Sequence, residues 1–396
     1  EQRRWLERDS IQQLAEHIRP LAQDAVDYAH LLKQIERQES DAIDLATIDI
    51  AAAVQTLRFA DNPLANEIAD TIDTYYRNAN VRLALSADII QRAIPTMESR
   101  ELPVNTSILG SRVRGNSRIE SDLSIELVPA VDRWNMKLKT DGTVATRSTG
   151  LRSAVAFTTD ASSSFRAETP IVITRQDIAV EQSQVDVRGR TRLRRVRSDY
   201  DGWPLIGSLV NSIAENRYQA LAPRANRIAN RTIRDRISSE IDDELDTRVD
   251  DATTKLSQLV LGPLGRLELD PMVMDMQTTE QRLLARFRVA GDWQMAANTP
   301  RPRAPSTSLM SVQMHQSALN NTLEQLVPKG ERLTIREFVH RAGEILGQQE
   351  VPIPDDIPEN VSIQFSRTRP VTIEIRENRV WITLRVVRLK RDEMLD

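Results

Sequence analysis

Four arginines alternate with other residues in the stretch RGRTRLRRVR, residues 188–197: Arg188, Arg190, Arg192 and Arg194. Alternate residues of an extended strand point to the same face, so this spacing predicts a row of guanidinium groups along one strand. A guanidinium fork binds phosphate or carboxylate through paired hydrogen bonds. We therefore predict a contact for phosphate headgroups or for an acidic partner. The same pattern is also typical of a solvated strand face that discourages edge pairing.

Residues 240–251 are rich in carboxylates, which are Glu240, Asp242, Asp243, Glu244, Asp246, Asp250 and Asp251. Carboxylates could hold a cation, but at these positions of a helix they spread around the axis instead of converging. We expect a solvated helix face, or charge pairing with a neighbouring chain.

No arrangement of residue types indicates catalysis. The four histidines, His17, His30, His315 and His340, lack the spacing of metal ligands, and the chain has no cysteine. The sequence contains no nucleophile elbow, Walker loop or dinucleotide fingerprint. We therefore expect no catalytic residue, no metal, no cofactor, and a protein that is not an enzyme.

Composition narrows the class of partner and the compartment. Charged residues make up 28% of the 396 residues, but the net charge is −4, so no global positive field favours nucleic acid. No run approaches the roughly 20 apolar residues that a membrane span needs. The chain begins EQRRWLERDS without Met, which fits either a processed protein or a chain trimmed behind a signal or anchor. We expect export to a periplasm or cell envelope rather than a cytoplasmic location.

The hydrophobic pattern changes along the chain. Residues 1–78 have helical periodicity, whereas residues 112–197 alternate with period two, which predicts long antiparallel strands. Asp141-Gly142 has the composition of a hairpin turn within this region. One amphipathic helix should end at Pro223, and a second, residues 224–260, would be about 55 Å long at 1.5 Å per residue. Strands should follow, three of them at the C-terminal end.

A strand-then-helix pattern occurs twice. Val81 and Leu83 alternate before Ser86 opens a short apolar helix, and Val312 and Met314 alternate before SALNN begins a helix with Ser317 as its N-cap. Both duplication and coincidence explain the recurrence. In the second unit we expect Val312 and Met314 to face the closed side of a sheet, with Gln313 and His315 toward water.

These features together resemble the TULIP superfamily of tubular lipid-binding proteins, which includes the bactericidal/permeability-increasing proteins. The resemblance rests on the long amphipathic helix beside alternating strands and on the Ser-Ala-Leu-Asn helix that follows a strand, and it covers about residues 80–389. It implies a tubular, apolar-lined fold that takes up lipid chains.

We expect an elongated α+β protein with long curved antiparallel sheets wrapped around long amphipathic helices. Its parts should be a helical N-terminal segment, residues 1–78, a first sheet-and-helix half, residues 79–222, and a second half, residues 223–396. The expected function is non-enzymatic binding or transfer of a lipid or other apolar ligand in a bacterial cell envelope. The predicted lining is Val81, Leu83, Ile125, Leu127, Phe287, Val289, Met314, Ile373, Ile382 and Leu384.

Three other interpretations remain open, of which hydrolase activity has no activated nucleophile in the sequence to support it. The sheet faces could be filled by ordinary core packing. The chain could instead be a structural subunit of a homo-oligomeric envelope or surface assembly, with the charged helix and the N-terminal helices as contact surfaces.

Overall fold

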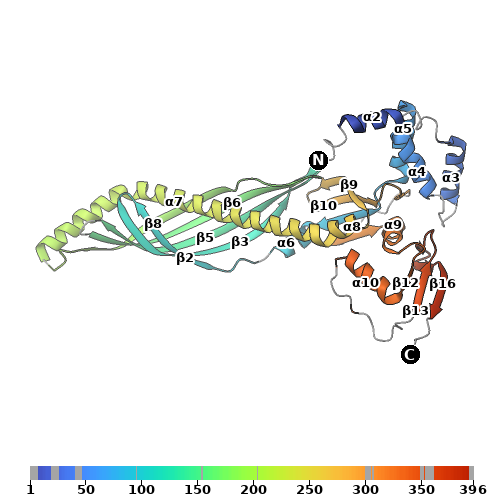
Figure 1. The fold of residues 1–396 in the computed structure, drawn as a ribbon. Helices are drawn as coiled ribbons and strands as arrows, with labels where there is room; N and C mark the ends of the chain where they lie inside the picture. The colour runs from blue at the N-terminus through green and yellow to red at the C-terminus, as the bar shows by residue number, and fades with distance from the viewer. Residues whose placement is uncertain are drawn as a thin grey trace.

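The computed structural model describes residues 8–18, 26–40, 47–94, 96–152, 155–202, 204–298, 305, 307–347, 352 and 361–391. It is an elongated α+β molecule in which a long curved sheet and one long helix form a rod, and smaller α and β elements gather at one end of it (Figure 1). The predicted fold class is therefore confirmed.

The rod is built on an antiparallel sheet with the order β2-β3-β5-β6-β7, in which β8 also pairs with β6. Its strands are long because polar and apolar residues alternate over the whole of each one. The bounds are Arg100–Ile108 for β2, Ser111–Leu127 for β3, Trp134–Arg152 for β5, Val155–Ile173 for β6, Ile178–Val180 for β7 and Gln184–Ser198 for β8.

The predicted hairpin turn at Asp141-Gly142 is wrong, because both residues lie in the middle of β5. Gly142 is needed there for close packing: a Cβ on it would lie 2.5 Å from Cζ of Phe165 on β6. Asp141 faces the other side and accepts a hydrogen bond from Nε of Arg166 at 2.8 Å. Gly142 was therefore misinterpreted as a turn residue, although it is a strand residue that leaves space for the ring of Phe165.

One helix, α7, runs from Pro204–Leu256 and contains Pro223 in its interior. The predicted break at Pro223 is therefore wrong, and the predicted boundary between residues 222 and 223 falls inside this helix. At 1.5 Å per residue α7 is about 80 Å long. It lies along the sheet in Figure 1 and continues through a π-helical turn, η2 (Ser257–Leu261), into α8 (Gly262–Arg266).

A second sheet, with the order β11-β1-β10-β9-β4, lies at the end of the rod where the smaller elements gather (Figure 1). The indole of Trp134 at the start of β5 joins the two sheets by donating to the carbonyl oxygen of Leu284 at 2.7 Å. The elements are β1 (Val81–Ser86), α6 (Ala87–Ala93), β4 (Ala130–Val131), β9 (Asp270–Thr278), β10 (Arg282–Ala290), β11 (Met310–Met314) and α9 (Gln316–Leu326).

The two strand-then-helix units meet in this second sheet, where β1 and β11 pair antiparallel. Ser86 is the N-cap of α6, as predicted, but the N-cap of α9 is His315, which accepts from the backbone N–H of Ser317. The expected orientation of β11 is also wrong. Val312 is 51% exposed and Met314 50% exposed, because β11 is an edge strand and no described element covers this side of it.

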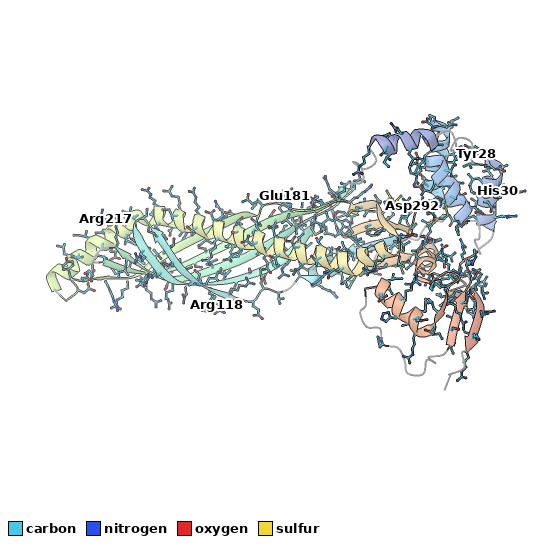
Figure 2. The ribbon with its side chains drawn as sticks, in the orientation of Figure 1. Tyr28, His30, Arg118, Glu181, Arg217 and Asp292 are labelled. Atoms are coloured by element: carbon cyan, nitrogen blue, oxygen red, sulfur yellow. The ribbon has the colours of Figure 1, made fainter. Side chains whose placement is uncertain are left out.

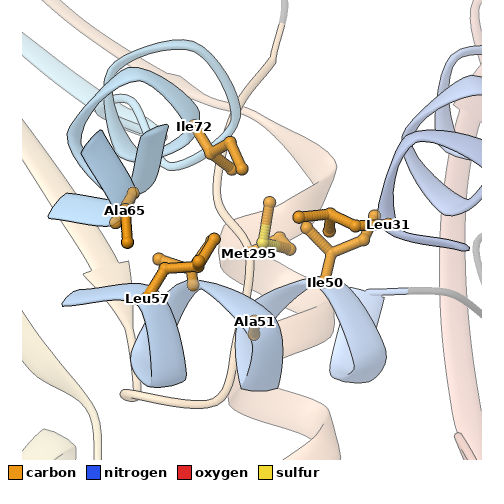
Figure 3. Close-up of a cluster of buried hydrophobic side chains, with 9 residues drawn as sticks. Leu31, Ile50, Ala51, Leu57, Ala65, Ile72 and Met295 are labelled. Carbon is orange, nitrogen blue, oxygen red and sulfur yellow. The ribbon is translucent and has the colours of Figure 1, made fainter. Parts of the chain in front are cut away.

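Helices of the N-terminal segment pack on the loop after β10. Figure 3 shows Leu31, Ile50, Leu57 and Ile72 around Met295 from that loop. The helices in this cluster are α3 (Tyr28–Ser40), α4 (Thr47–Arg58) and α5 (Pro63–Tyr76), and α2 (Asp9–Ile18) precedes them in the chain. The predicted start of α5 at Asn62-Pro63 is confirmed.

The C-terminal part contains four strands beyond residue 360 where three were expected. Its elements are β12 (Arg332–Thr334), α10 (Ile335–Ile345), β13 (Val361–Phe365), β14 (Val371–Arg376), β15 (Arg379–Leu384) and β16 (Val386–Arg391). Glu377 and Asn378 form the turn between β14 and β15, with φ of 52° and 58°. This turn has the left-handed geometry that a two-residue hairpin favours.

Candidate ligand cavity

A cavity of about 790 Å³ lies between the concave face of the long sheet and the first part of α7. The sheet contributes inward-facing residues such as Leu102, Val113 and Phe157, and the helix contributes residues such as Ile213 and Leu221. The walls are therefore mainly aliphatic and aromatic, with β2, β3, β5, β6 and β8 on one side and α7 on the other.

Small side chains create this space. Four residues of the helical wall are alanines, Ala214, Ala222, Ala225 and Ala229, and the last three follow one another at helical spacing. Opposite them, inward positions of the sheet carry residues such as Ser148, Gly150 and Ala161. A close-packed interior normally leaves few voids larger than a water molecule, so small residues on two facing walls leave a cavity.

The next part of the same concave face is filled. There Val144, Phe165 and Val187 pack against Ile237 of α7, supported by Ile119 and other aliphatic neighbours. The packed core and the cavity therefore lie side by side on one continuous sheet, and the boundary between them is where the inward residues change from large to small.

Hydroxyl groups on the cavity wall are paired with one another. Oγ of Ser117 lies 2.6 Å from Oγ1 of Thr146, and Oγ of Ser148 lies 3.0 Å from Oγ1 of Thr159. Each pair satisfies part of its own hydrogen-bonding capacity. These hydroxyls therefore do not require a ligand with polar groups.

Tyr218 is the polar aromatic residue of the helical wall. Its ring stacks on Phe157 with 5.6 Å between centroids and 26° between planes. Burial raises the pKa of the Tyr218 phenol above its ordinary value.

Charged side chains also reach the cavity. They are Arg152 from the sheet and Arg217, Arg236 and Glu240 from α7, all of them exposed. Nε of Arg236 donates to Oε1 of Glu240 at 3.0 Å, which occupies part of that guanidinium. The cavity therefore combines an apolar interior with charged groups at its solvent-exposed margin.

The predicted arginine row lies on the other side of the sheet. Thr191 lines the cavity, so its neighbours Arg190 and Arg192 point to the convex face, and both are exposed. A β-bulge at Arg194 shifts the register of β8, and as a result Arg195 and Arg197 point to the convex face as well. The sequence predicted the row but not this extension of it.

Neighbouring strands enlarge the row into an arginine surface, which consists of Arg112, Arg114, Arg118, Arg147, Arg190, Arg192, Arg194, Arg195 and Arg197. Figure 2 shows Arg118 and Arg217 of α7 on opposite sides of the rod. Asp160 lies within the surface and accepts from Nε of Arg147 at 3.0 Å and from Nη1 of Arg194 at 2.8 Å. Arg188, two residues before Arg190 in β8, forms an ion pair with Asp186 at 3.3 Å.

None of the ten predicted lining residues lines this cavity. Leu127 and Ile125 belong to a packed core beside Met136 and Leu283, near the junction of the two sheets. Val81, Leu83, Phe287, Val289 and Met314 lie in β1, β10 and β11, and Ile373, Ile382 and Leu384 lie in β14 and β15. Met314, Ile382 and Leu384 are at least half exposed. A ligand contact at any of these positions stays a prediction.

Large apolar residues such as Val113 and Phe157 line the cavity, but their positions alone do not locate it, because its space depends on the small side chains between them. The signals that could have found it are the spacing of Ala222, Ala225 and Ala229 on one helix face and the small residues at alternate positions such as Ser148 and Gly150.

Histidines and carboxylates do not converge in the part of the chain that the structure describes, where no group of three or more His, Asp or Glu side chains could hold a metal ion. His30 lies 2.9 Å from the Gln34 amide, and His340 lies 3.6 Å from Glu344. The side chain of His17 lies outside the described set. Of the described helices, none has both the length and the apolarity to cross a bilayer.

Comparison with known proteins gives little beyond the geometry. No protein-family model and no curated protein matches the chain. Among solved structures, a crystal structure of lipopolysaccharide binding protein is similar with a TM-score of 0.28 and 11% sequence identity, over 79% of this chain and 83% of that one. A similarity at this level establishes neither a common fold nor a common ligand.

Proposed function

We propose that this protein binds a lipid-like apolar ligand, without catalysis, in the cavity between α7 and the long sheet. The observation that carries the proposal is the facing pair of small-residue walls, which leave about 790 Å³ open directly beside a filled part of the same sheet. Ligand sites commonly have volumes of about 300–1,000 Å³ and mainly apolar walls.

The ligand class follows from the lining. The aliphatic side chains provide dispersion contacts, and the hydroxyls of the sheet are already paired with one another. A lining of this kind suits a hydrocarbon chain. Arg152 and Arg217 lie at the cavity margin and are both exposed. They suit an anionic group at the end of that chain, because guanidinium binds phosphate and carboxylate strongly.

The arginine surface has a separate role in the proposal. Arg188, Arg190, Arg192 and Arg194 were predicted to contact a headgroup, but a ligand inside the cavity cannot reach the convex face. We propose that these arginines contact anionic groups outside the molecule, such as the surface of a membrane that donates or receives the ligand.

The sequence-based expectation of export and of a bacterial cell envelope belongs to the same proposal. A lipid carrier between membranes needs an apolar cavity and reversible contact with anionic surfaces, and both features are compatible with this structure. Fractionation of the native cells tests the compartment independently of ligand binding.

The direct test is organic extraction of the purified full chain, followed by mass spectrometry, together with titration by a fluorescent fatty-acid analogue. Ala225→Phe should place a ring in the cavity and lower the affinity for the analogue about tenfold or more. Ala220→Phe is the matched control, because Ala220 is an exposed residue of α7 that does not line the cavity. An extract without lipid, together with equal affinities of the two variants, would refute the proposal.

A further inference from the structure

The end of α7 is a helix without a partner. Residues 250–261 are all exposed, although they include several large aliphatic side chains. Leu259 is 75% exposed, and Leu256, Val260 and Leu261 are also exposed. Aliphatic residues on a helix normally face another element, so a helical stretch exposed on every side needs an explanation.

Carboxylates precede this aliphatic stretch. Glu240 and Glu244 of α7 pair with Arg236 and Arg248, at 3.0 Å and 2.7 Å. In contrast, Asp246, Asp250 and Asp251 have no ion-pair partner within the described ranges, and all are exposed. We call Asp246, Asp250, Asp251, Leu256, Leu259 and Val260 the helix-end surface.

A second bare apolar surface lies in the C-terminal part. Every residue of β15 and β16 is exposed. Val380 and Ile382 of β15 and Val387 and Leu389 of β16 are each more than 60% exposed. Within the described chain β15 pairs only with β14, and β16 pairs only with β13, so each strand also leaves one edge free. We call these two strands the C-terminal edge.

The charge of the C-terminal edge is opposite to that of the helix-end surface. Arg379, Arg388 and Arg391 are exposed there, and none of them has a carboxylate partner among the residues that the structure describes. Nearby Arg376 pairs with Glu374 and stacks over Trp381 at 5.2 Å. Among the described residues, three arginines without a carboxylate partner therefore accompany exposed aliphatic side chains along the two strands of the C-terminal edge, and three aspartates without an ion-pair partner accompany them on the helix-end surface.

We propose that the helix-end surface of one copy of this chain docks on the C-terminal edge of a second copy. Both surfaces are bare within a single chain, so they do not cover each other. An apolar centre with complementary charges at its rim is the usual composition of a protein interface. Because the two surfaces differ, the contact is head-to-tail, and it generates a ring or a filament according to the angle between copies.

Charge reversal on the full chain tests the pairing. Analytical ultracentrifugation should show concentration-dependent association of the wild type, and both Asp250→Lys/Asp251→Lys and Arg388→Glu/Arg391→Glu should weaken it about tenfold or more. An equimolar mixture of the two variants should restore association, because the reversed charges then face each other. Restoration also shows that both variants are folded.

Arg190→Glu/Arg192→Glu on the arginine surface is the control, which should associate like the wild type. A wild type that stays monomeric at every concentration, or a mixture that does not recover, overturns the proposal. So does loss of binding to anionic phospholipid vesicles in Arg388→Glu/Arg391→Glu without any effect on self-association, because the C-terminal edge would then be a membrane contact.

Discussion

Arg190 and Thr191 are consecutive residues of β8, yet their side chains lie on opposite sides of one sheet, Thr191 in the wall of the cavity and Arg190 on the convex face. Because successive side chains of a strand point to opposite faces, β8 contributes both to the apolar cavity and to the cationic surface. The two functions can therefore be separated by mutation.

Asp160→Asn should strengthen binding to anionic vesicles several-fold at low salt. Asp160 accepts hydrogen bonds from Arg147 and Arg194, and its replacement frees both guanidinium groups of the arginine surface. Co-sedimentation with vesicles over a range of salt concentrations measures the change, since such attraction is screened by salt. Asp141→Asn is the control, because Asp141 pairs with Arg166 outside the surface. An equal effect of the two substitutions would contradict the assignment.

The same vesicle binding should stay constant between about pH 7 and pH 5. The hydrogen bond from Arg147, followed by the one from Arg194, lowers the pKa of Asp160 below its ordinary value near 4. A carboxyl with a depressed pKa stays ionised through this window and keeps its two arginines neutralised. Steadily stronger binding of the wild type, but not of Asp160→Asn, on acidification to pH 5 would show that the carboxylate is losing its charge.

Tyr218 reports occupancy of the cavity through its ionisation. Burial already raises the pKa of its phenol, and a bound hydrocarbon chain should raise that pKa further by excluding water. A group with a raised folded-state pKa stabilises the fold below its unfolded pKa near 10, and this contribution is lost as the pH rises through the folded pKa. Phenolate absorbance with and without ligand, corrected by subtraction of Tyr218→Phe, measures the shift. No shift on ligand saturation would place the ligand elsewhere.

Gly142→Ala should destabilise the protein by about 1–3 kcal/mol, the usual cost of overpacking. The added Cβ would lie 2.5 Å from Cζ of Phe165 and 2.6 Å from the carbonyl oxygen of Glu120, which belongs to the backbone and cannot turn away. Gly202→Ala should be close to neutral, because nothing lies within 4 Å of its Cβ position. Urea unfolding followed by circular dichroism compares the two, and equal midpoints would show that the packing tolerates the added methyl group.

Asn80→Ala should cost about 2–4 kcal/mol, because the side chain of Asn80 acts as a backbone substitute in the second sheet. It is fully buried, and it accepts from the N–H of Val289 at 2.7 Å and donates to the carbonyl oxygen of the same residue at 2.9 Å. Asn80→Asp keeps the acceptor and loses the donor, so it tests the two bonds separately. An unfolding free energy unchanged in Asn80→Ala would show that water replaces both partners.

The sequence predicted the elements whose pattern arises from burial. The alternation of Ile119, Ile125 and Leu127 reflects a strand with one covered face, and Asn62-Pro63 fixes a helix start through local chemistry alone. Both signals are contained in a few consecutive residues, so no knowledge of distant partners is needed.

Most of the failures depend on the tertiary surroundings of a residue. Gly142 avoids Phe165, which lies on the next strand of the sheet. Pro223 lies within α7, where the exposed side of a long helix tolerates a missing N–H. The cavity itself arises where Ala225 faces small residues of the sheet, a match between segments that no local pattern contains.

The continuity of α7 also has a mechanical consequence. The part of α7 that lines the cavity is centred near Ala225, and the helix-end surface, in the last turns of α7 and in η2, is centred about 40 Å further along at 1.5 Å per residue. A ligand that displaced this wall and thereby shifted the far end of the same helix would couple the two sites. Two sites joined in this way are linked reciprocally: if lipid uptake changes the affinity between copies, assembly must change the affinity for lipid by the same factor.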